Sequence, residues 1–187
     1  LRRKTFRDRL DWKVECVEDM EKDQFDNPNT TYLLGMYEGE LLCGARFINS
    51  THPTMISEIF HNYFAETIIL PTDVPCCEIS RLFLDKERRD SSSLQGVPAS
   101  KALFLAMNIY CIKNKYHGMY AVVSRGMYAI FRHANWKVEV IQRGLSEKGE
   151  VIYYIFMPAS INIIEDIISK DKSSHWLREM LEHLRHL

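Results

Sequence analysis

The chain has 187 residues, of which 46% are hydrophobic and 26% are charged, and its formal net charge is -1. This length falls within the single-domain range, and the composition is that of a globular protein with a sizeable core. A net charge so close to zero argues against a protein whose main task is to bind nucleic acid or an anionic membrane. We therefore expect one domain over residues 1–187.

The cysteines indicate a reducing, cytoplasmic environment. They are odd in number, show no CxxC spacing and include an adjacent pair that backbone geometry rarely bridges: Cys16, Cys43, Cys76, Cys77 and Cys111. The longest apolar stretch, residues 102–112, is interrupted by Asn108 and is too short to span a bilayer. The sequence opens at Leu1 inside a segment with helical character, so we expect residues upstream of it to be missing.

Two charge blocks of opposite sign lie side by side near the N-terminus. Residues 1–10 are rich in arginine and lysine, whereas residues 15–26 are rich in glutamate and aspartate. Such blocks are often two solvated faces that attract each other. Phe6 and Trp12 lie among the basic residues and Phe25 among the acidic ones, which favours a lid-like region with a charged binding site.

The elements that follow predict a mixed α/β sheet flanked by helices. Residues 31–37 and 40–48 are β-rich runs around Glu38-Gly39 and predict a hairpin. The later elements are expected to be a helix at 56–64, a strand at 76–84, a polar loop at 85–96, a buried helix at 99–114 ended by Gly118, a strand at 119–123, a helix at 126–134, strands at 136–142 and 151–157, and a helical tail at 161–187 with a break at 170–174. The strand, helix and strand over 76–123 predict a right-handed parallel crossover with antiparallel pairs on either side.

Several common catalytic motifs are absent from the sequence. No GxGxxG or GxxxxGK[ST] loop precedes a helix, so nucleotide hydrolysis is not expected. The seven histidines form no HExxH, and we predict no metal site. Ser124 lacks the GxSxG frame of a nucleophile elbow, which argues against a serine hydrolase.

The strand at 76–84 carries three polar side chains, Glu78, Ser80 and Arg81, in an apolar run. Isolated buried charges cost several kcal/mol unless they are paired, so these residues indicate either a functional site or a structural Glu78–Arg81 ion pair. Strand alternation puts Glu78 and Ser80 on one face and Arg81 on the other. A β-bulge between Ser80 and Arg81 would bring them together; otherwise Arg81 reaches around an edge or pairs on the second face.

An ordered set of residues closely resembles the LuxI-type acyl-homoserine-lactone synthases up to about Pro158. The set comprises Arg2-x-x-x-Phe6, Trp12, Met20-Glu-x-Asp23-x-Phe-Asp26, Arg46-Phe47, Glu78-x-Ser80-Arg81-x-Phe83-x-Asp85 and Val123-Ser124-Arg125. The resemblance does not extend to the tail over 159–187. The resemblance implies a fold similar to that of the GCN5-type N-acetyltransferases. It also implies a bacterial acyltransferase that takes an acyl chain from acyl carrier protein, joins it to S-adenosyl-L-methionine as a substrate, and releases methylthioadenosine and a quorum-sensing signal, with no cofactor.

The resemblance also implies roles for particular residues. Glu78 is the expected general base, helped by Ser80 and Arg81. The S-adenosylmethionine side is expected to comprise Arg2, Phe6, Trp12, Asp23, Asp26, Arg46 and Phe83. Trp12 has an alternative role as a hydrophobic staple that holds down the first helix.

An apolar pocket for the acyl chain is expected between the buried helix and its neighbouring strands, lined by Phe104, Met107, Ala121, Val123, Met127 and Ile130. Each of these residues is equally compatible with plain core. Relatives that prefer a 3-oxo chain often have threonine where Ala121 stands, and alanine has no hydroxyl to bind the oxo group. We therefore expect no strong 3-oxo preference.

Acyl carrier protein is acidic as a class, so its docking surface should be basic. The candidate residues are Arg125, Arg132, Lys137 and Lys148, although each is also compatible with an ordinary solvated charge.

Two other functions remain open from the sequence. An N-acetyltransferase that uses acetyl-CoA would share the fold, but residues 85–100 lack the usual [QR]xxGx[GA] turn for the CoA pyrophosphate. A non-catalytic small-molecule sensor could use the same scaffold. The presence of Glu78, Arg81 and the charged N-terminal residues argues against a sensor.

Overall fold

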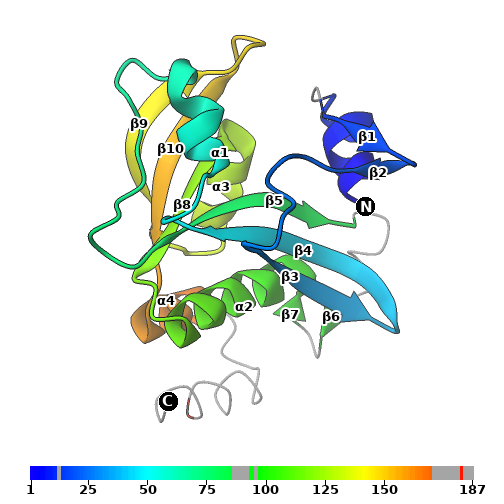
Figure 1. Ribbon diagram of the computed structural model, residues 1–187. Coiled ribbons are helices and arrows are strands. Elements are labelled where there is room, and N and C mark those ends of the chain that lie inside the picture. Colours follow the sequence, from blue (N-terminus) through cyan, green and yellow to red (C-terminus); the bar gives the residue numbers. More distant parts are fainter. Residues whose placement is uncertain (12–13, 86–92, 95–96, 170–181, 183–187) are drawn as a thin grey trace.

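The structure is a computed structural model that describes residues 1–11, 14–85, 93–94, 97–169 and 182. The described residues form a six-stranded sheet in the order β3-β4-β5-β8-β10-β9 (Figure 1). Its strands are β3 (Thr30–Tyr37), β4 (Glu40–Asn49), β5 (Cys77–Leu84), β8 (Gly118–Ser124), β9 (Glu139–Leu145) and β10 (Val151–Pro158). Two small antiparallel pairs lie outside it, namely β1 (Cys16–Val17) with β2 (Met20–Glu21), and β6 (Ser93–Leu94) with β7 (Val97–Pro98).

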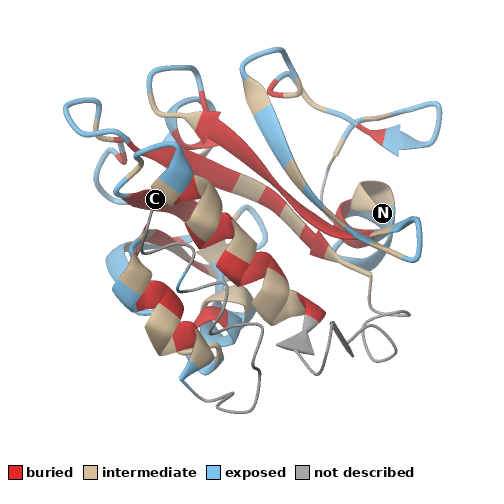
Figure 2. Ribbon diagram, turned by 90° about the horizontal axis from the view of Figure 1, so that it is seen from below, coloured by how far each residue is buried: buried red, intermediate tan, exposed pale blue. Residues whose placement is uncertain are grey.

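The helices divide between the two faces of the sheet. They are η1 (Lys4–Arg9, a π-helix), α1 (Met55–Glu58), η2 (Phe60–Tyr63, a 3₁₀-helix), α2 (Ala99–Lys113), α3 (Arg125–His133) and α4 (Ile161–Ile168). One apolar cluster joins α2, α3 and α4 to the sheet, and a second joins α1 and residues 64–76 to β8 and β10. We call the first side the α2 face. Buried residues follow the central strands and α2 (Figure 2).

The predicted mixed sheet is confirmed, including its parallel centre. β5 pairs with β8 in parallel across α2, whereas β3–β4 and β9–β10 are antiparallel hairpins. Glu38 and Gly39 both have positive φ, 50° and 80°, as a two-residue hairpin turn requires. Two N-cap serines begin later helices, since Ser124 accepts from the Met127 N–H and Ser160 from the Ile163 N–H.

Three predicted elements differ in their bounds. The helix expected at 56–64 is two short turns, α1 and η2, separated at Ile59. The strand expected at 136–142 begins only at Glu139, because Trp136 is buried in the α2-face cluster and its Nε1–H donates to the Pro158 carbonyl. Helix α2 ends at Lys113, before Gly118, and Lys115 adopts a left-handed φ of 59° just beyond it.

Of the alternatives considered for Arg81, the structure shows the β-bulge in β5. Ser80 pairs with Arg46 and Phe83 with Gly44, so Arg81 and Leu82 together oppose one residue of β4. Arg81 has a φ of 51°, the left-handed conformation that the extra residue demands.

The bulge reverses the alternation of β5 beyond it. Leu82 and Leu84 pack on the α2-face cluster, whereas Phe83 lies over Gly44 on the opposite face. A Cβ at Gly44 would approach Phe83 Cζ to 2.8 Å, so only glycine fits beneath this ring. The face with Glu78, Ser80, Arg81 and Phe83 is called the charged face below.

The part of the chain that the structure describes contains no helix long and apolar enough to cross a bilayer.

Candidate active site

Three arginines and three carboxylates form a closed ring on the charged face. Each arginine contacts two of the carboxylates, and each carboxylate contacts two of the arginines. In order around the ring the residues are Arg2, Glu21, Arg81, Asp23, Arg46, Asp26 and again Arg2, with N–O distances between 2.5 and 3.0 Å. Their charges sum to zero. We call this set the arginine–carboxylate network.

The network is deeply buried, yet its charges are compensated. The side chains of Glu21 and Arg46 are fully buried, and that of Arg81 is 7% exposed. The Arg81 guanidinium lies 5.3 Å from the centre of the Phe6 ring, and that of Arg46 lies 5.7 Å from the centre of Phe25. Removing one partner from such a network leaves an uncompensated buried charge, which typically costs about 3 to 5 kcal/mol.

The network holds the N-terminal segment onto β4 and β5. Arg2 lies just before η1 and Glu21 in β2, whereas Arg46 and Arg81 belong to the central strands. Although burial opposes it, the bond from Arg2 lowers the pKa of Asp26, so this carboxylate stays ionised at neutral pH.

Met55 connects the network to helix α1. Its sulfur accepts from Arg46 Nη2 at 3.0 Å and lies 3.4 Å from Arg81 Nη1. Arg46 Nε also donates to Ser80 Oγ at 3.1 Å. This bond places the network directly beside Ser80, which is the next residue after Glu78 on the charged face.

Glu78 lies next to the network but is bonded differently. The Ile56 N–H donates to Glu78 Oε2 at 2.7 Å, while Oε1 has no hydrogen-bond partner among the described residues. Glu78 is 1% exposed, and burial raises the pKa of its carboxyl, which the Ile56 N–H opposes in part. The alternative of a Glu78–Arg81 ion pair is wrong, because Arg81 is paired with Glu21 and Asp23.

A capping box fixes the Ile56 N–H that binds Glu78. The Ser57 N–H donates to Thr54 Oγ1 at 3.2 Å, and the Thr54 N–H donates to Ser57 Oγ at 3.0 Å. Thr54 is fully buried at the start of α1. The short helix is thereby held so that its second amide points at Oε2 and leaves Oε1 unpaired.

The two parallel central strands separate beside Glu78. They pair only at Cys77–Met119 and Glu78–Tyr120, although β5 continues to Leu84 and β8 to Ser124. Figure 1 shows the two strands diverging from this point. A buried carboxyl with a raised pKa and one free oxygen, at the point where a sheet opens, is suited to accept a proton from a bound nucleophile.

Comparison with known proteins identifies the family. Residues 1–167 match the family model described as autoinducer synthase. The acyl-homoserine-lactone synthase of Serratia liquefaciens is 45% identical over 159 residues, covering 84% of this chain and 78% of the relative. That of Dickeya chrysanthemi is 42% identical over 158 residues, covering 84% and 74%. The chain belongs to the autoinducer synthase family. It is an acyltransferase, an acyl-homoserine-lactone synthase, as the resemblance predicted.

Solved structures agree with the fold of the synthase. A CoA-dependent acyl-homoserine lactone synthase with SAM and isopentyl-CoA matches with a TM-score of 0.76 at 20% identity, over 90% of this chain and 77% of that one. The AHL synthase LasI matches with a TM-score of 0.74 at 19% identity, over 90% and 84%. At these identities the match shows the fold alone.

The structure brings most of the predicted charged residues of the synthase together. Arg2, Asp23, Asp26, Arg46 and Arg81 all belong to the network. Ser80 touches it, Phe6 packs on Arg81, and Phe83 lies on the same face. Trp12 falls outside the described residues.

Three functional features were missed from the sequence. Glu21 is an equal member of the network, and its place between Met20 and Asp23 in the acidic block was the available signal. The other two features are the Met55 sulfur and the Thr54 capping box. Both reach the site only because α1 docks on the sheet, so no local sequence pattern connected them with Glu78. The described residues hold no cluster of three or more His, Cys, Asp or Glu side chains placed to bind a metal ion.

The predicted acyl-pocket residues divide between core and surface. Phe104, Met107 and Ala121 are buried in the α2-face cluster, and Val123 and Met127 pack against it. Ile130 is 49% exposed. It lines a surface hollow of about 450 Å³ together with Phe104.

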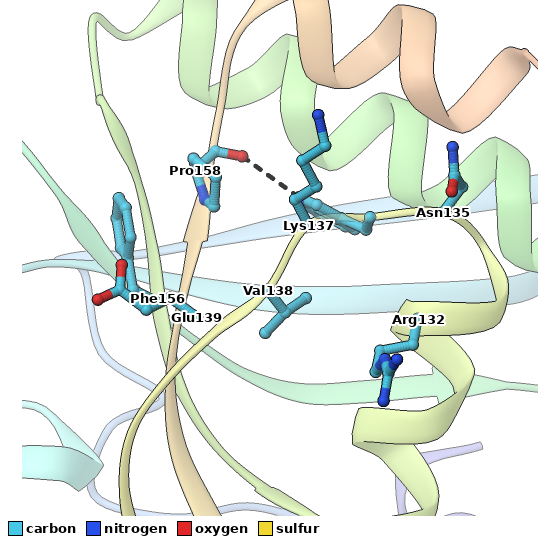
Figure 3. A pocket seen from close by; sticks show the side chains of 8 residues that line it. Arg132, Asn135, Lys137, Val138, Glu139, Phe156 and Pro158 are labelled. Carbon is cyan, nitrogen blue, oxygen red and sulfur yellow. Dashed lines mark hydrogen bonds between the residues drawn. The ribbon is translucent and has the colours of Figure 1, made fainter.

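Two of the predicted docking residues, Arg132 and Lys137, line one hollow of about 640 Å³ (Figure 3). Lys137 Nζ also lies 2.8 Å from Asp166 Oδ2 on α4. Arg125 is exposed at the first position of α3. Lys148 lies in the turn after β9, roughly 20 Å along the strand from Lys137, and pairs with Asp11.

Proposed function

We propose that the synthase acylates the amino group of S-adenosyl-L-methionine with a chain carried as a thioester on acyl carrier protein, then closes the lactone and releases methylthioadenosine. The observation that carries this mechanism is Glu78, which is buried with one oxygen fixed by the Ile56 N–H and the other without a hydrogen-bond partner among the described residues. Structural relatives are described in complexes with SAM or with MTA, which supports this substrate.

Acylation needs a proton acceptor. An α-amino group has a pKa of about 7.7 to 8.0, so the substrate amine is largely protonated near neutral pH. Glu78 Oε1 takes this proton, directly or through a water, and the free amine attacks the thioester carbon. A C–N bond forms and the C–S bond breaks, while the second proton of the attacking amine passes to the departing sulfur, which leaves as the carrier thiol. The raised pKa of Glu78 makes its carboxylate a better base than an exposed glutamate.

Lactonisation needs positioning rather than a base. The methionine carboxylate attacks the carbon attached to the sulfonium, a C–O bond forms, and the electron pair of the broken C–S bond neutralises the sulfonium as methylthioadenosine leaves. Holding carboxylate and carbon at attack distance is the main contribution that the protein makes to this step.

The arginine–carboxylate network orders the N-terminal segment over the S-adenosylmethionine side. Because each network charge is already paired, its members shape the site and hold Ser80 beside Glu78. Phe6 and Phe83 contribute aromatic faces, and the role of Trp12 in attracting the sulfonium stays a prediction.

The acyl chain enters where β5 and β8 separate and extends toward Phe104, Met107, Ala121, Val123 and Met127 on the α2 face. Ile130 then marks the outer end of this path. Methionines repack readily, so such a pocket can admit a chain without a preformed cavity. Ala121 offers no donor to a 3-oxo group.

The donor is proposed to be acyl carrier protein, which would dock on a basic surface formed by Arg132 and Lys137 at the hollow in Figure 3 and by Arg125 at the first position of α3. Lys148 belongs to this proposal only as an outlying contact, because it pairs with Asp11 at the other end of β9. The five cysteines are free thiols, which supports a cytoplasmic location.

The proposal is tested by incubating the purified synthase with S-adenosylmethionine and either hexanoyl carrier protein or hexanoyl-CoA, and identifying products by mass spectrometry. We expect hexanoyl-homoserine lactone and methylthioadenosine, with higher kcat/KM for the carrier-protein donor. Arg132→Glu should lower that value and leave the CoA reaction unchanged. A higher kcat/KM for hexanoyl-CoA would overturn the donor assignment, and no lactone from either donor would overturn the function.

A further inference from the structure

Asn108 is a fully buried amide with one unsatisfied oxygen. It lies in the middle of α2, and its Nδ2 donates to the Phe104 carbonyl at 3.2 Å. A carbonyl can only accept, so this bond fixes which amide atom is nitrogen. Oδ1 then has no hydrogen-bond partner among the described residues. Buried acceptors without partners are rare in native proteins, and each one calls for an explanation.

The position of Asn108 along α2 is set by its helical neighbours. Phe104, Asn108 and Cys111 share one side of the helix at i, i+4 and i+7. Cys111 Sγ lies 4.0 Å from Cys77 Sγ on β5, and the Phe104 ring packs 5.1 Å from that of Phe131 on α3. Asn108 therefore faces the sheet rather than solvent.

Asn108 also lies level with the point where the sheet opens. A helix that joins two parallel strands runs antiparallel to them, so one turn back from Cys111 moves about 5 Å along β5 in the direction of Glu78 and Ile79. This is where pairing between β5 and β8 ends. A chain whose thioester reacts beside Glu78 and which passes to the α2 face would bring its first carbons past Asn108.

We propose that Asn108 is a specificity-determining residue that selects a 3-hydroxyacyl chain, an inference that rests on the proposed function. Its Oδ1 accepts a hydrogen bond from the 3-hydroxyl. A 3-oxo group can take only the second N–H of Asn108 and leaves Oδ1 unpaired, whereas an unsubstituted methylene pairs with neither. Sites built to bind a hydroxyl discriminate strongly against substrates that lack it.

The test compares three donors of equal length, hexanoyl, 3-oxohexanoyl and 3-hydroxyhexanoyl carrier protein, by kcat/KM with S-adenosylmethionine fixed. The 3-hydroxy donor should be favoured at least about tenfold over each of the others. Asn108→Leu, of similar volume, should remove that advantage, so that the ratio of kcat/KM for the 3-hydroxy donor to kcat/KM for the hexanoyl donor falls to about one.

Asn114→Leu is the matched control. Asn114 also donates to the carbonyl four residues before it, that of Tyr110 at 2.8 Å, but it is exposed, so its replacement should leave the donor ratios unchanged. Lactone formation without a 3-hydroxy advantage in the unaltered synthase overturns this inference alone. An advantage that survives Asn108→Leu also overturns it. No lactone from any donor overturns the proposed function as well.

Discussion

The arginine–carboxylate network and Glu78 are both buried charged groups on the same face of the sheet, but they are satisfied to very different degrees. Every network side chain contacts two partners of opposite charge, whereas Glu78 receives one backbone N–H and, within the described part of the chain, Oε1 has no hydrogen-bond partner. Full pairing compensates each buried charge and holds the N-terminal segment onto β4 and β5. Incomplete pairing lets burial raise the pKa of Glu78 and leaves its Oε1 able to accept a proton from the substrate. Whether a buried charged residue has a structural or a catalytic role therefore depends on its partners rather than on its residue type.

The sharpest way to break this contrast is Glu78→Gln. The fold should be retained, because glutamine still accepts from the Ile56 N–H, but kcat should fall by roughly 10²- to 10⁴-fold as the proton acceptor is lost. The rate of lactone formation at saturating substrates measures kcat. Glu66→Gln, at an exposed position, is the control and should behave as the unaltered synthase. Near-normal turnover by a folded Glu78→Gln enzyme would refute the assignment of the base.

The network should instead respond in stability. Glu21→Gln leaves Arg2 and Arg81 short of a buried counter-charge, so the free energy of unfolding should fall by about 3 to 5 kcal/mol in urea titrations. The exposed Asp11–Lys148 pair is the matched control, and Asp11→Asn should change that free energy by less than about 1 kcal/mol. If Glu21→Gln and Asp11→Asn lowered the free energy of unfolding equally, burial of the network would not be the source of its contribution to stability.

Glu78 should also make stability depend on pH. Its folded pKa lies above the ordinary value of about 4.3, so its contribution is fully present below that value and is lost as pH rises through the folded pKa. Glu78→Gln cannot ionise, and it should gain stability relative to the unaltered synthase over this window. Urea unfolding of both proteins from pH 4.5 to 8 measures the difference. A difference that does not vary with pH would contradict the raised pKa.

The smallest effect is expected at the capping box. Thr54→Ala removes the cap of α1 and should cost about 1 kcal/mol of unfolding free energy. It also loosens the Ile56 N–H that opposes the raised pKa of Glu78, so the acid limb of the kcat/KM profile should move to higher pH. Thr54→Ser should restore both properties. A profile that stays in place while stability falls would make Thr54 purely structural.

Much of this site could be predicted before any coordinates. The order of the elements from the β3–β4 hairpin to β10 followed from periodicity and turn residues. The conflict between Glu78 and Arg81 in strand alternation made a bulge one of the expected alternatives, and the structure shows this bulge at Arg81. The bounds of β9 and α1 were less predictable, because the burial of Trp136 and the docking of α1 on Glu78 are long-range contacts. The pairing of Glu21 with Arg81, 60 residues apart, likewise has no local signature.

The sequence by itself determined the class of sheet, the family to which the chain belongs and the identity of the charged residues, because periodicity and ordered motifs are local properties. Only the tertiary structure decided which charged residues are fully paired and which one, Glu78, is not. Partners for Arg46 and Arg81 come from the distant N-terminal segment, and the one amide that binds Glu78 comes from α1. The same holds for Asn108, whose unpaired oxygen is defined by packing around α2. Satisfaction of a buried polar atom depends on what folds against it, and this information is spread over the whole chain.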